Sequence, residues 1–262
     1  MNLELIADKI NILSDFCSKR DLESLNKADL FNTYNINKAD LLILFGGSII
    51  EGFDVAGKAF LDDLADNFML VGGEGHTTEK LRSTVQSLFP TLEINKDSEA
   101  IIMKKYLSSK YNLSKFYLEE NSTNCGNNVT YALDLIKKSN LSSKNIIIIQ
   151  DSTMQLRMDA VFKKYDPHFN IINFAPYRSN VIVKNNKLEF EDTTILGMWE
   201  IDKFISLLMG EIPRLHDTKD GYGPKGQNFL AHVSIPSKVL EAFNYLKENY
   251  KDLTRIANPK FS

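Results

Sequence analysis

The carboxylates of this chain that could do chemistry stand mostly at the ends of short apolar runs. Glu74 and Glu120 each follow one such run, and Asp151 follows a third. Glu99 instead begins a predicted helix, where the helix dipole alone favours an acid. Two carboxylates that converge in a pocket suit general acid–base catalysis or a divalent cation, whereas isolated ones are ordinary solvated side chains. Glu99 and Glu120 are the candidate catalytic pair.

Two glycine-rich turns follow two successive apolar runs. The first contains Gly46, Gly47 and Ser48, and the second begins with Gly72 and Gly73. Backbone without a Cβ can approach a phosphate, a ribose or a carboxylate closely. A tight turn from strand to helix explains either glycine pair by itself. Two such turns in succession favour a ligand-binding role for these five residues.

Hydroxyl and amide side chains gather ahead of a predicted helix that ends near residue 135. Ser122, Thr123 and Asn124 precede this helix, and Asn128 lies in its first turn. One such residue suffices to cap the helix. We therefore expect some of them to face a ligand and to hold one another by hydrogen bonds.

A third polar corner contains Asp151 and Thr153, and Arg157 follows about one helical turn later. A guanidinium at this place can grip an anion at the mouth of a pocket, although an ordinary surface arginine is the alternative. A side chain at a pocket mouth contributes little to the core. We therefore expect Arg157→Ala to leave the fold intact and to weaken an anionic ligand.

Glu74 and His76 extend the candidate site, and His76 is the best placed of the four histidines. No second His or Cys stands near it at the spacing of zinc ligands, and no serine lies in a nucleophile elbow. We therefore expect neither a metal site nor a serine hydrolase.

Five apolar runs alternate with amphipathic helices, which is typical of a parallel sheet covered on both faces. The runs lie at 41–45, 68–71, 115–119, 146–149 and 171–174. This alternation predicts a three-layer, Rossmann-like α/β core over residues 36–177. Ligands bind such sheets at the carboxyl ends of the strands, so the polar clusters described above are predicted to meet there.

Additional segments flank this core. Apolar residues at three- and four-residue steps predict a helix within residues 1–35, packed on the core. Residues 178–262 are predicted to form a smaller α+β subdomain. Its hairpin turns at Asn185 and Asn186, because asparagine tolerates the positive φ of a tight turn.

The rest of this subdomain contains two predicted helices and a loop. One helix runs from about 198 to 208 and ends at Gly210, and Pro213 is expected to prevent any continuation. The glycine-rich loop at 220–226 either closes over the pocket or merely joins this helix to the last one.

Composition narrows the range of functions. Lys+Arg 31 against Asp+Glu 34 gives a net charge of -3, which argues against the basic surface of a nucleic-acid binder. No apolar run approaches the roughly 20 residues of a membrane-spanning helix. Cys17 and Cys125 are far apart and match no metal-ligand spacing, which favours a reducing, cytoplasmic setting. We expect a small-molecule ligand and neither a nucleic acid nor a membrane as partner, and we leave the oligomeric state open.

Several motifs occur in the order found in one known family. They are Gly72-Gly73, Ser98-Glu99-Ala100, ENSTNCGNN at 120–128, QDSTMQLR at 150–157 and DGYGPKG at 220–226, followed by Phe229, His232 and Pro236. From about residue 40 to residue 236, the chain resembles the YdcF-like family, which includes the SanA and ElyC envelope proteins.

This resemblance implies a cytosolic Rossmann-like protein that binds S-adenosylmethionine and has no settled reaction. The pocket residues that it implies are Glu99, Glu120, Ser122, Asn124, Asn128 and Arg157. Asn127 stands where the wider family usually has glutamate, which argues against a carboxylate base there. The turn after the first run lacks the spacing of the familiar methyltransferase signature, so a methyltransferase mechanism does not follow.

Three hypotheses on function stay open at this point. The first is a binder of a nucleotide-like ligand, S-adenosylmethionine above all, with possible transfer chemistry. The second is a hydrolase or lyase of a phosphorylated or glycosyl metabolite, with Glu99 and Glu120 as acid and base and Arg157 on the anion. The third is a ligand sensor without catalysis.

Overall fold

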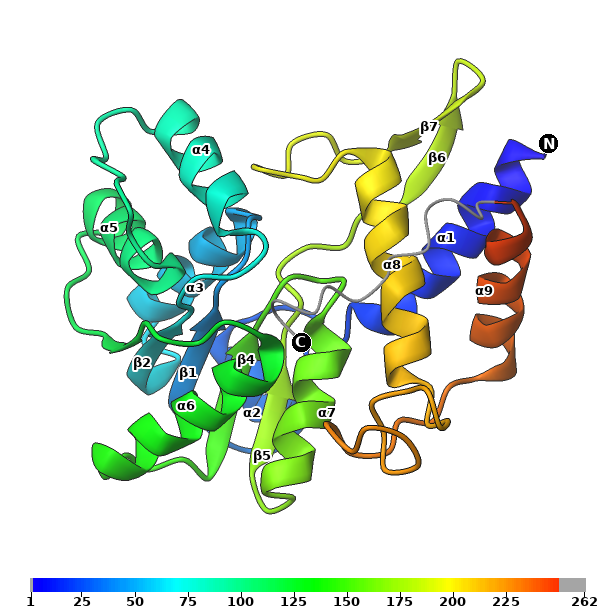
Figure 1. The fold of residues 1–262 in the computed structure, drawn as a ribbon. Coiled ribbons are helices and arrows are strands. Elements are labelled where there is room, and N and C mark those ends of the chain that lie inside the picture. Colours follow the sequence, from blue (N-terminus) through cyan, green and yellow to red (C-terminus); the bar gives the residue numbers. More distant parts are fainter. Residues whose placement is uncertain (1, 250–262) are drawn as a thin grey trace.

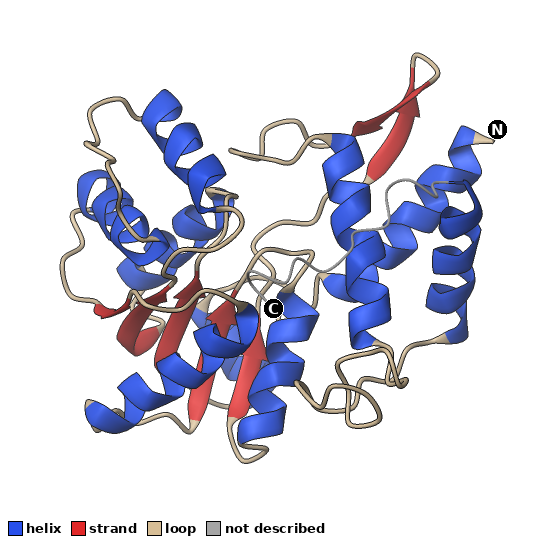
Figure 2. Cartoon of the chain, viewed as in Figure 1, coloured by secondary structure: helices blue, strands red, loops and turns tan. Residues whose placement is uncertain are grey.

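The sheet at the centre of the molecule contains five parallel strands. In this computed structural model, which describes residues 2–249, their order is β3-β2-β1-β4-β5. The strands are β1 (Ala39–Phe45), β2 (Ala65–Val71), β3 (Tyr117–Glu119), β4 (Asn145–Ile149) and β5 (Asn170–Asn173). Helices cover both faces of the sheet (Figures 1 and 2), so the predicted Rossmann-like α/β fold is confirmed.

Alternation of side chains along the strands gives the sheet two apolar faces. In β1, Leu41 and Ile43 belong to one cluster of buried side chains, and Leu42 and Leu44 belong to the other. Helices α6 (Cys125–Lys138) and α7 (Gln155–Tyr165) contribute to the first cluster, and α2 (Lys27–Tyr34), α3 (Glu51–Leu61), α4 (Thr78–Leu88) and α5 (Glu99–Tyr111) contribute to the second. Both faces are therefore buried, which explains the continuous apolar runs.

The strand order reverses between β1 and β4. From β1 the chain adds β2 and then β3 on one side, and later adds β4 and then β5 on the other side. The connections after β1 and β4 therefore leave the sheet toward opposite sides, and they open a crevice at its carboxyl edge.

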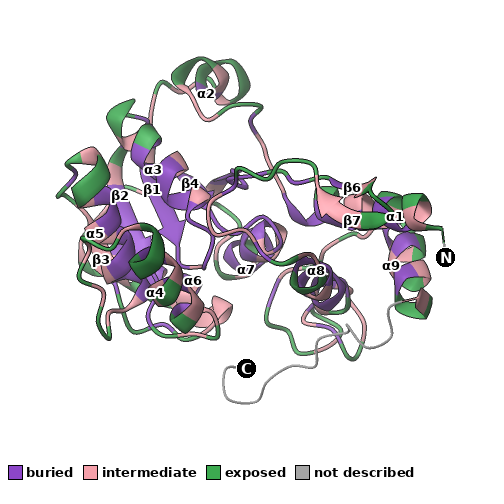
Figure 3. Ribbon diagram, turned by 90° about the horizontal axis from the view of Figure 1, so that it is seen from above, coloured by how far each residue is buried: buried purple, intermediate pink, exposed green. Residues whose placement is uncertain are grey.

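The N-terminal helix α1 (Leu3–Cys17) belongs with the C-terminal part of the chain. It contacts α7 of the sheet core, and it packs more extensively on α9 (Ser237–Asn249), on β6 (Val181–Lys184) and on α8 (Ile201–Leu215). Figures 1 and 3 show α1 beside α9. We use the name terminal unit for α1, the hairpin at 181–190, α8, α9 and the loops that join the hairpin, α8 and α9.

The hairpin of the terminal unit has the predicted turn. Strands β6 (Val181–Lys184) and β7 (Lys187–Phe190) pair antiparallel. Asn185 and Asn186 between them have φ values of 50° and 59°. Positive φ at both central residues is the geometry that matches the twist of the strands, so the prediction is confirmed.

The prediction that Gly210 ends the helix and that Pro213 prevents its continuation is wrong. Helix α8 continues to Leu215 with Pro213 inside it. Its buried residues lie on both sides of Gly210, among them Leu208 and Ile212. Burial of this stripe outweighs the cost of an internal proline, which is about 3 kcal/mol in an isolated helix.

The helices present one buried and one exposed face, as the burial colours of Figure 3 show.

In the part of the chain that the structure describes, every helix is too short or too polar to cross a membrane.

Candidate functional site

A cleft of about 1000 Å³, counted with the open space at its mouth, lies at the carboxyl edge of the sheet. The turns that follow β1, β2, β3 and β4 all contribute to it. The predicted site residues that line it are Gly46, Gly47, Ser48, Gly73, His76, Glu99, Ser122, Thr123, Asn124, Asn128, Asp151, Thr153 and Arg157. Residues from four separate turns therefore converge on one cavity.

Two predicted carboxylates lie outside the lining of the cleft. The side chain of Glu74 is 69% exposed and lies 3.7 Å from Arg82. Glu120 is exposed, and its Oε2 accepts a hydrogen bond from Ser98 Oγ at 3.2 Å. The carboxylates that line the cleft are therefore Glu99 and, in place of Glu120, Asp151.

Two of the predicted glycines make room for Glu99. A Cβ on Gly46 would lie 2.0 Å from Glu99 Oε2, and a Cβ on Gly72 would lie 2.9 Å from Glu99 Cβ. No side chain fits at either position unless Glu99 moves. Gly72 does not line the cleft, and its role is to accommodate Glu99.

Glu99 is buried at the start of α5, with 7% of its surface exposed. Its Oε1 accepts hydrogen bonds from Thr78 Oγ1 at 2.8 Å and from Thr77 Oγ1 at 3.3 Å. Burial raises the pKa of Glu99 above its ordinary value, and the two threonine hydroxyls only partly oppose this rise. A carboxyl group in this condition exchanges a proton closer to neutral pH than a solvated one does.

The polar cluster ahead of α6 is largely committed to local structure. Asn124 is the N-cap, and its side chain accepts a hydrogen bond from the N–H of Asn127 at 2.9 Å. Ser122 Oγ accepts one from the N–H of Gly73 at 3.2 Å. A Cβ on Gly73 would lie 2.4 Å from the carbonyl oxygen of Ser122, so the two turns pack backbone to backbone.

Asp151 is held by four hydrogen bonds from uncharged donors. Its Oδ1 accepts from the N–H and Oγ1 of Thr153 at 2.9 and 2.6 Å. Its Oδ2 accepts from the hydroxyl of Tyr177 at 3.1 Å and from Nε1 of Trp199 at 3.2 Å. Burial raises the pKa of Tyr177 well above its ordinary value, and the charge of Asp151 raises it further. The hydroxyl of Tyr177 therefore stays a donor.

Three helix N-termini face the cleft. Thr77, Asn124 and Met154 are the N-cap residues of α4, α6 and α7, and all three line it. Of these, Asn124 alone makes a capping bond with its side chain. The first N–H groups of α4 and α7, together with the positive end of each dipole, therefore favour an anionic group in the cleft.

Arg157 lines the cleft, and the structure excludes the alternative of an ordinary surface arginine, because its guanidinium is buried. Its side chain is 12% exposed, and its Nε and Nη2 donate to the two carboxylate oxygens of Glu211 in α8 at 2.7 and 3.0 Å. Burial opposes the charge of the guanidinium, but Cys125 and Glu211 stabilise it and raise the pKa of Arg157. The expectation that Arg157→Ala leaves the fold intact therefore rests on the wrong environment.

Sequence reasoning missed the part of the cleft that the terminal unit supplies. These residues are Trp199, Leu207, Arg214 and Tyr222. Trp199 is the single tryptophan of the chain, and Tyr222 lies in the glycine-rich loop, which were the available signals. The core adds Thr77, Cys125, Gln150 and Met154, which sequence reasoning did not assign to the site either, and Gly75 of the second glycine-rich turn.

The glycine-rich loop is packed on the backbone at the end of α8. A Cβ on Gly221 would lie 1.9 Å from the carbonyl oxygen of His216, the C-cap of α8. The N–H of Tyr222 donates to the carbonyl of Arg214 in α8 at 2.9 Å. This compact arrangement brings Tyr222 to the wall of the cleft.

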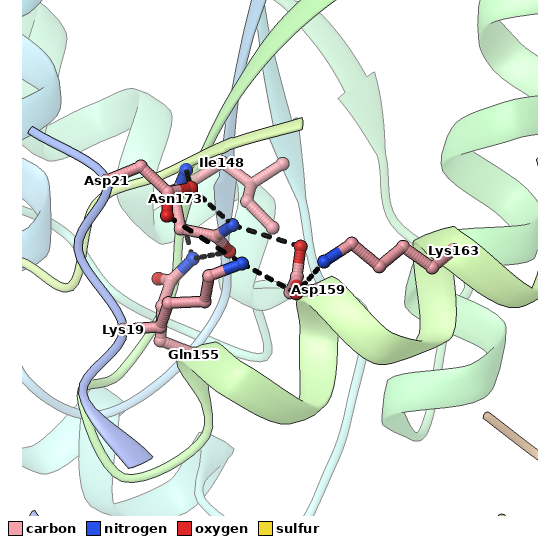
Figure 4. A network of polar contacts seen from close by, with 7 residues as sticks. All are labelled: Lys19, Asp21, Ile148, Gln155, Asp159, Lys163 and Asn173. Carbon is pink, nitrogen blue, oxygen red and sulfur yellow. Dashed lines mark hydrogen bonds and ion pairs between the residues drawn. The ribbon is translucent and has the colours of Figure 1, made fainter. Parts of the chain in front are cut away.

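A buried polar network supports the turn after β4 from behind. Gln155 Oε1 accepts from the N–H of Gln150 at 2.8 Å, and Gln155 Nε2 donates to Asn173 Oδ1 at 3.1 Å. Asn173 Nδ2 in turn donates to Asp21 at 2.7 Å and to Asp159 at 3.0 Å, and Lys19 and Lys163 pair with Asp159 (Figure 4). The network therefore links Gln150, which lines the cleft, to the segment that follows α1.

No three His, Cys, Asp or Glu side chains within residues 2–249 are placed to hold a metal ion together. No model of a known protein family matches this chain. The resemblance to the YdcF-like family therefore stays a prediction from its motifs.

Proposed function

We propose that the cleft binds a nucleoside-like small molecule that carries both a positive and a negative group, with S-adenosylmethionine as the foremost candidate. The observation that carries the proposal is the charge on the cleft wall. Glu99 and Asp151 are buried there, and neither forms an ion pair with a Lys or Arg among residues 2–249. A cationic group of the ligand would compensate these carboxylates.

The arginines of the cleft argue against a polyphosphate ligand. The charge of Arg157 is balanced by Glu211, and the guanidinium of Arg214 donates to the carbonyl of Gly210. A nucleoside diphosphate or triphosphate needs an excess of positive charge around it. The sulfonium and ammonium groups of S-adenosylmethionine instead match the two carboxylates of the wall, Glu99 and Asp151, which form no ion pair with a Lys or Arg among residues 2–249.

The anionic end of the same ligand would bind next to the two carboxylates. The N-termini of α4 and α7 adjoin Glu99 and Asp151, and they offer N–H groups of the first turn and positive dipole ends for a carboxylate. Ser48 Oγ, on the cleft wall, is fully buried and has no hydrogen-bond partner within the described residues. Such an atom is a natural contact for a polar group of a ligand.

A hydrolase or lyase is the second candidate, and the raised pKa of Glu99 is the observation that favours it. Glu120 lies outside the lining, so the partner of Glu99 in this alternative would be Asp151. In this alternative Glu99 would act as the acid and Asp151 as the base.

Calorimetry with S-adenosylmethionine, its neutral thioether product S-adenosylhomocysteine and ADP tests the proposal. We expect S-adenosylmethionine to bind about tenfold or more tightly than either of the others, because it alone carries a sulfonium. Asp151→Asn should weaken its binding by about 1–4 kcal/mol, the attraction between two unit charges about 4 Å apart in surroundings from bulk water to a protein surface. Emission of Trp199 gives a second readout, because this tryptophan is the only one in the chain and donates to Asp151.

Glu74→Gln is the matched control, since it removes a predicted carboxylate that lies outside the lining. It should leave affinity unchanged. Equal affinity for the sulfonium and the thioether, or tighter binding of ADP, would contradict the proposal. Turnover of a phosphorylated or glycosyl substrate that Glu99→Gln abolishes would favour the second candidate instead.

A further inference from the structure

Helix α8 turns one stripe of side chains toward the cleft. Leu207, Glu211 and Arg214 are spaced four and three residues apart, so they lie on the same face of this helix. Leu207 and Arg214 line the cleft, and Glu211 is bonded to Arg157 in the first turn of α7, which lies beside α8 (Figures 1 and 3). Arg214 therefore follows the Arg157–Glu211 pair by one helical turn, on the face that borders the cleft.

The charge of Arg214 is not balanced by a carboxylate. Both oxygens of Glu211 accept from Arg157, and no carboxylate oxygen within residues 2–249 lies within 4.0 Å of a guanidinium nitrogen of Arg214. Its Nη1 donates to the carbonyl of Gly210, whereas its Nε and Nη2 have no partner in that part of the chain. These two nitrogens are not buried, because the described atoms that are both buried and unpartnered do not include them. A half-buried guanidinium with two accessible donors is suited to bind an anion.

Tyr222 lies beside Arg214 on the wall of the cleft. The centre of its ring is 5.8 Å from Cζ of Arg214, and its N–H donates to the carbonyl of the same arginine at 2.9 Å. Its ring also meets Phe229 in a T-shaped contact, with the centres 5.4 Å apart. The hydroxyl of Tyr222 has no partner within the described residues and is not buried either. The backbone and the ring of Tyr222 are thus held in place, and its hydroxyl is available to a ligand.

Opposite charges in the cleft are kept apart. Glu99 and Asp151 belong to the sheet core and Arg214 belongs to the terminal unit, and no nitrogen of Arg214 lies within 4.0 Å of either carboxylate. The protein therefore does not neutralise these groups against one another. A ligand that carries both a positive and a negative group can compensate both sides at once, whereas a ligand with one charge compensates only one of them.

We infer that Arg214 and Tyr222 bind the carboxylate of the ligand beside the N-terminus of α7. This inference rests on the proposed function and assigns the anionic end of the ligand within it. Of the two helix N-termini that could receive this group, that of α7 is the one bonded to α8. The ligand class is then a nucleoside that carries an amino acid, and the terminal unit selects for its carboxylate.

The test compares S-adenosylmethionine with its decarboxylated form, which keeps the base, the sulfonium and the ammonium. Calorimetry measures both affinities for the wild type, which should bind S-adenosylmethionine about tenfold or more tightly. Arg214→Gln should weaken the binding of S-adenosylmethionine by about tenfold to a hundredfold, the worth of a hydrogen bond to a charged group. The same variant should not weaken the binding of the decarboxylated form.

Tyr222→Phe removes the hydroxyl alone and should weaken the binding of S-adenosylmethionine by about twofold to tenfold, with no loss for the decarboxylated form. This variant carries the test if thermal unfolding shows that Arg214→Gln does not fold. Arg178→Gln is the matched control, because it makes the same substitution at an exposed arginine outside the lining of the cleft. It should bind both ligands as the wild type does.

Equal losses for the two ligands in Arg214→Gln and Tyr222→Phe would show that these residues shape the cleft without contacting the carboxylate. Equal affinity of the wild type for the two ligands, or no loss in either variant, would place the carboxylate elsewhere. Each of these results overturns the inference while the proposed function stands. If the wild type binds neither ligand, the proposed function and this inference fall together.

Discussion

The two cleft carboxylates differ in how the protein satisfies them. Glu99 receives two threonine hydroxyls on one oxygen, whereas Asp151 receives four donors over both oxygens. Burial raises the pKa of Glu99, so the folded protein favours its neutral form more than the unfolded chain does. The stability of the fold is thereby linked to the proton on Glu99.

The first prediction is the pH dependence of Glu99→Gln. With a folded pKa above the ordinary 4.5, the contribution of Glu99 to stability is complete below pH 4.5 and is lost as the pH rises through the folded pKa. Glutamine is neutral at every pH. The variant should therefore gain stability over the wild type at neutral pH and little at pH 4, as urea unfolding at both values would measure.

Glu74→Gln again serves as the control, because it makes the same substitution at an exposed carboxylate outside the lining of the cleft. The same difference between variant and wild type at pH 4 and pH 7 would contradict the link between Glu99 and stability.

At the scale of elements, the cleft depends on turns that leave parallel strands at one edge. The turns after β1 and β2 contact Glu99, the first residue of α5. Glycine is required at Gly46 and Gly72, because a Cβ at either position would collide with the Glu99 side chain. Local pattern predicted these turns and their glycines. From the sequence, both glycine pairs were predicted to contact a ligand. Sequence spacing does not reveal that a side chain from a third element, Glu99, lies against them.

Gly46→Ala should destabilise the protein by about 1–3 kcal/mol, the usual cost of overpacking. The new Cβ would lie 2.0 Å from Glu99 Oε2, so the buried carboxyl must move. Gly47→Ala is the neighbouring control, because its nearest atom, Gln150 Oε1, would be 3.5 Å away. Thermal or urea unfolding of both variants checks this, and equal stabilities would contradict the assigned role of Gly46.

At the scale of the whole molecule, the cleft forms where the sheet core meets the terminal unit. Arg157 of α7 and Glu211 of α8 join the two parts through a buried bidentate pair. The carbonyl of Leu196 and the N–H of Ile50 join them at the turn after β1. One continuous cluster of buried apolar side chains runs through α1, α7 and α8, so the two parts share a core.

Arg157→Ala should cost about 3–5 kcal/mol of unfolding free energy, because it leaves the carboxylate of Glu211 buried without its partner. Urea unfolding measures this loss. The double variant Arg157→Met with Glu211→Leu should be closer to the wild type, since apolar side chains of similar size remove both charges together. A loss below about 1 kcal/mol in Arg157→Ala would show that Glu211 reaches water or another partner.

The elements of this protein were largely determined by the sequence itself. The five apolar runs, the cap at Asn124 and the hairpin turn at Asn185 and Asn186 depend on residues only a few positions apart. Such local preferences, with the rule that places ligands at the carboxyl edge of a parallel sheet, located the cleft. Pro213 is an exception, because burial of α8 overrode the local signal.

The chemistry of the cleft was decided by the tertiary structure. Gly46 and Glu99, Arg157 and Glu211, and Asp151 and Trp199 are each about 50 residues apart in the chain. Burial and Coulomb energy depend on such distant neighbours rather than on residue type, so the same arginine could be a surface anion grip or half of a buried ion pair. Only the packing of α8 and of the loop before it against the sheet core distinguished these roles.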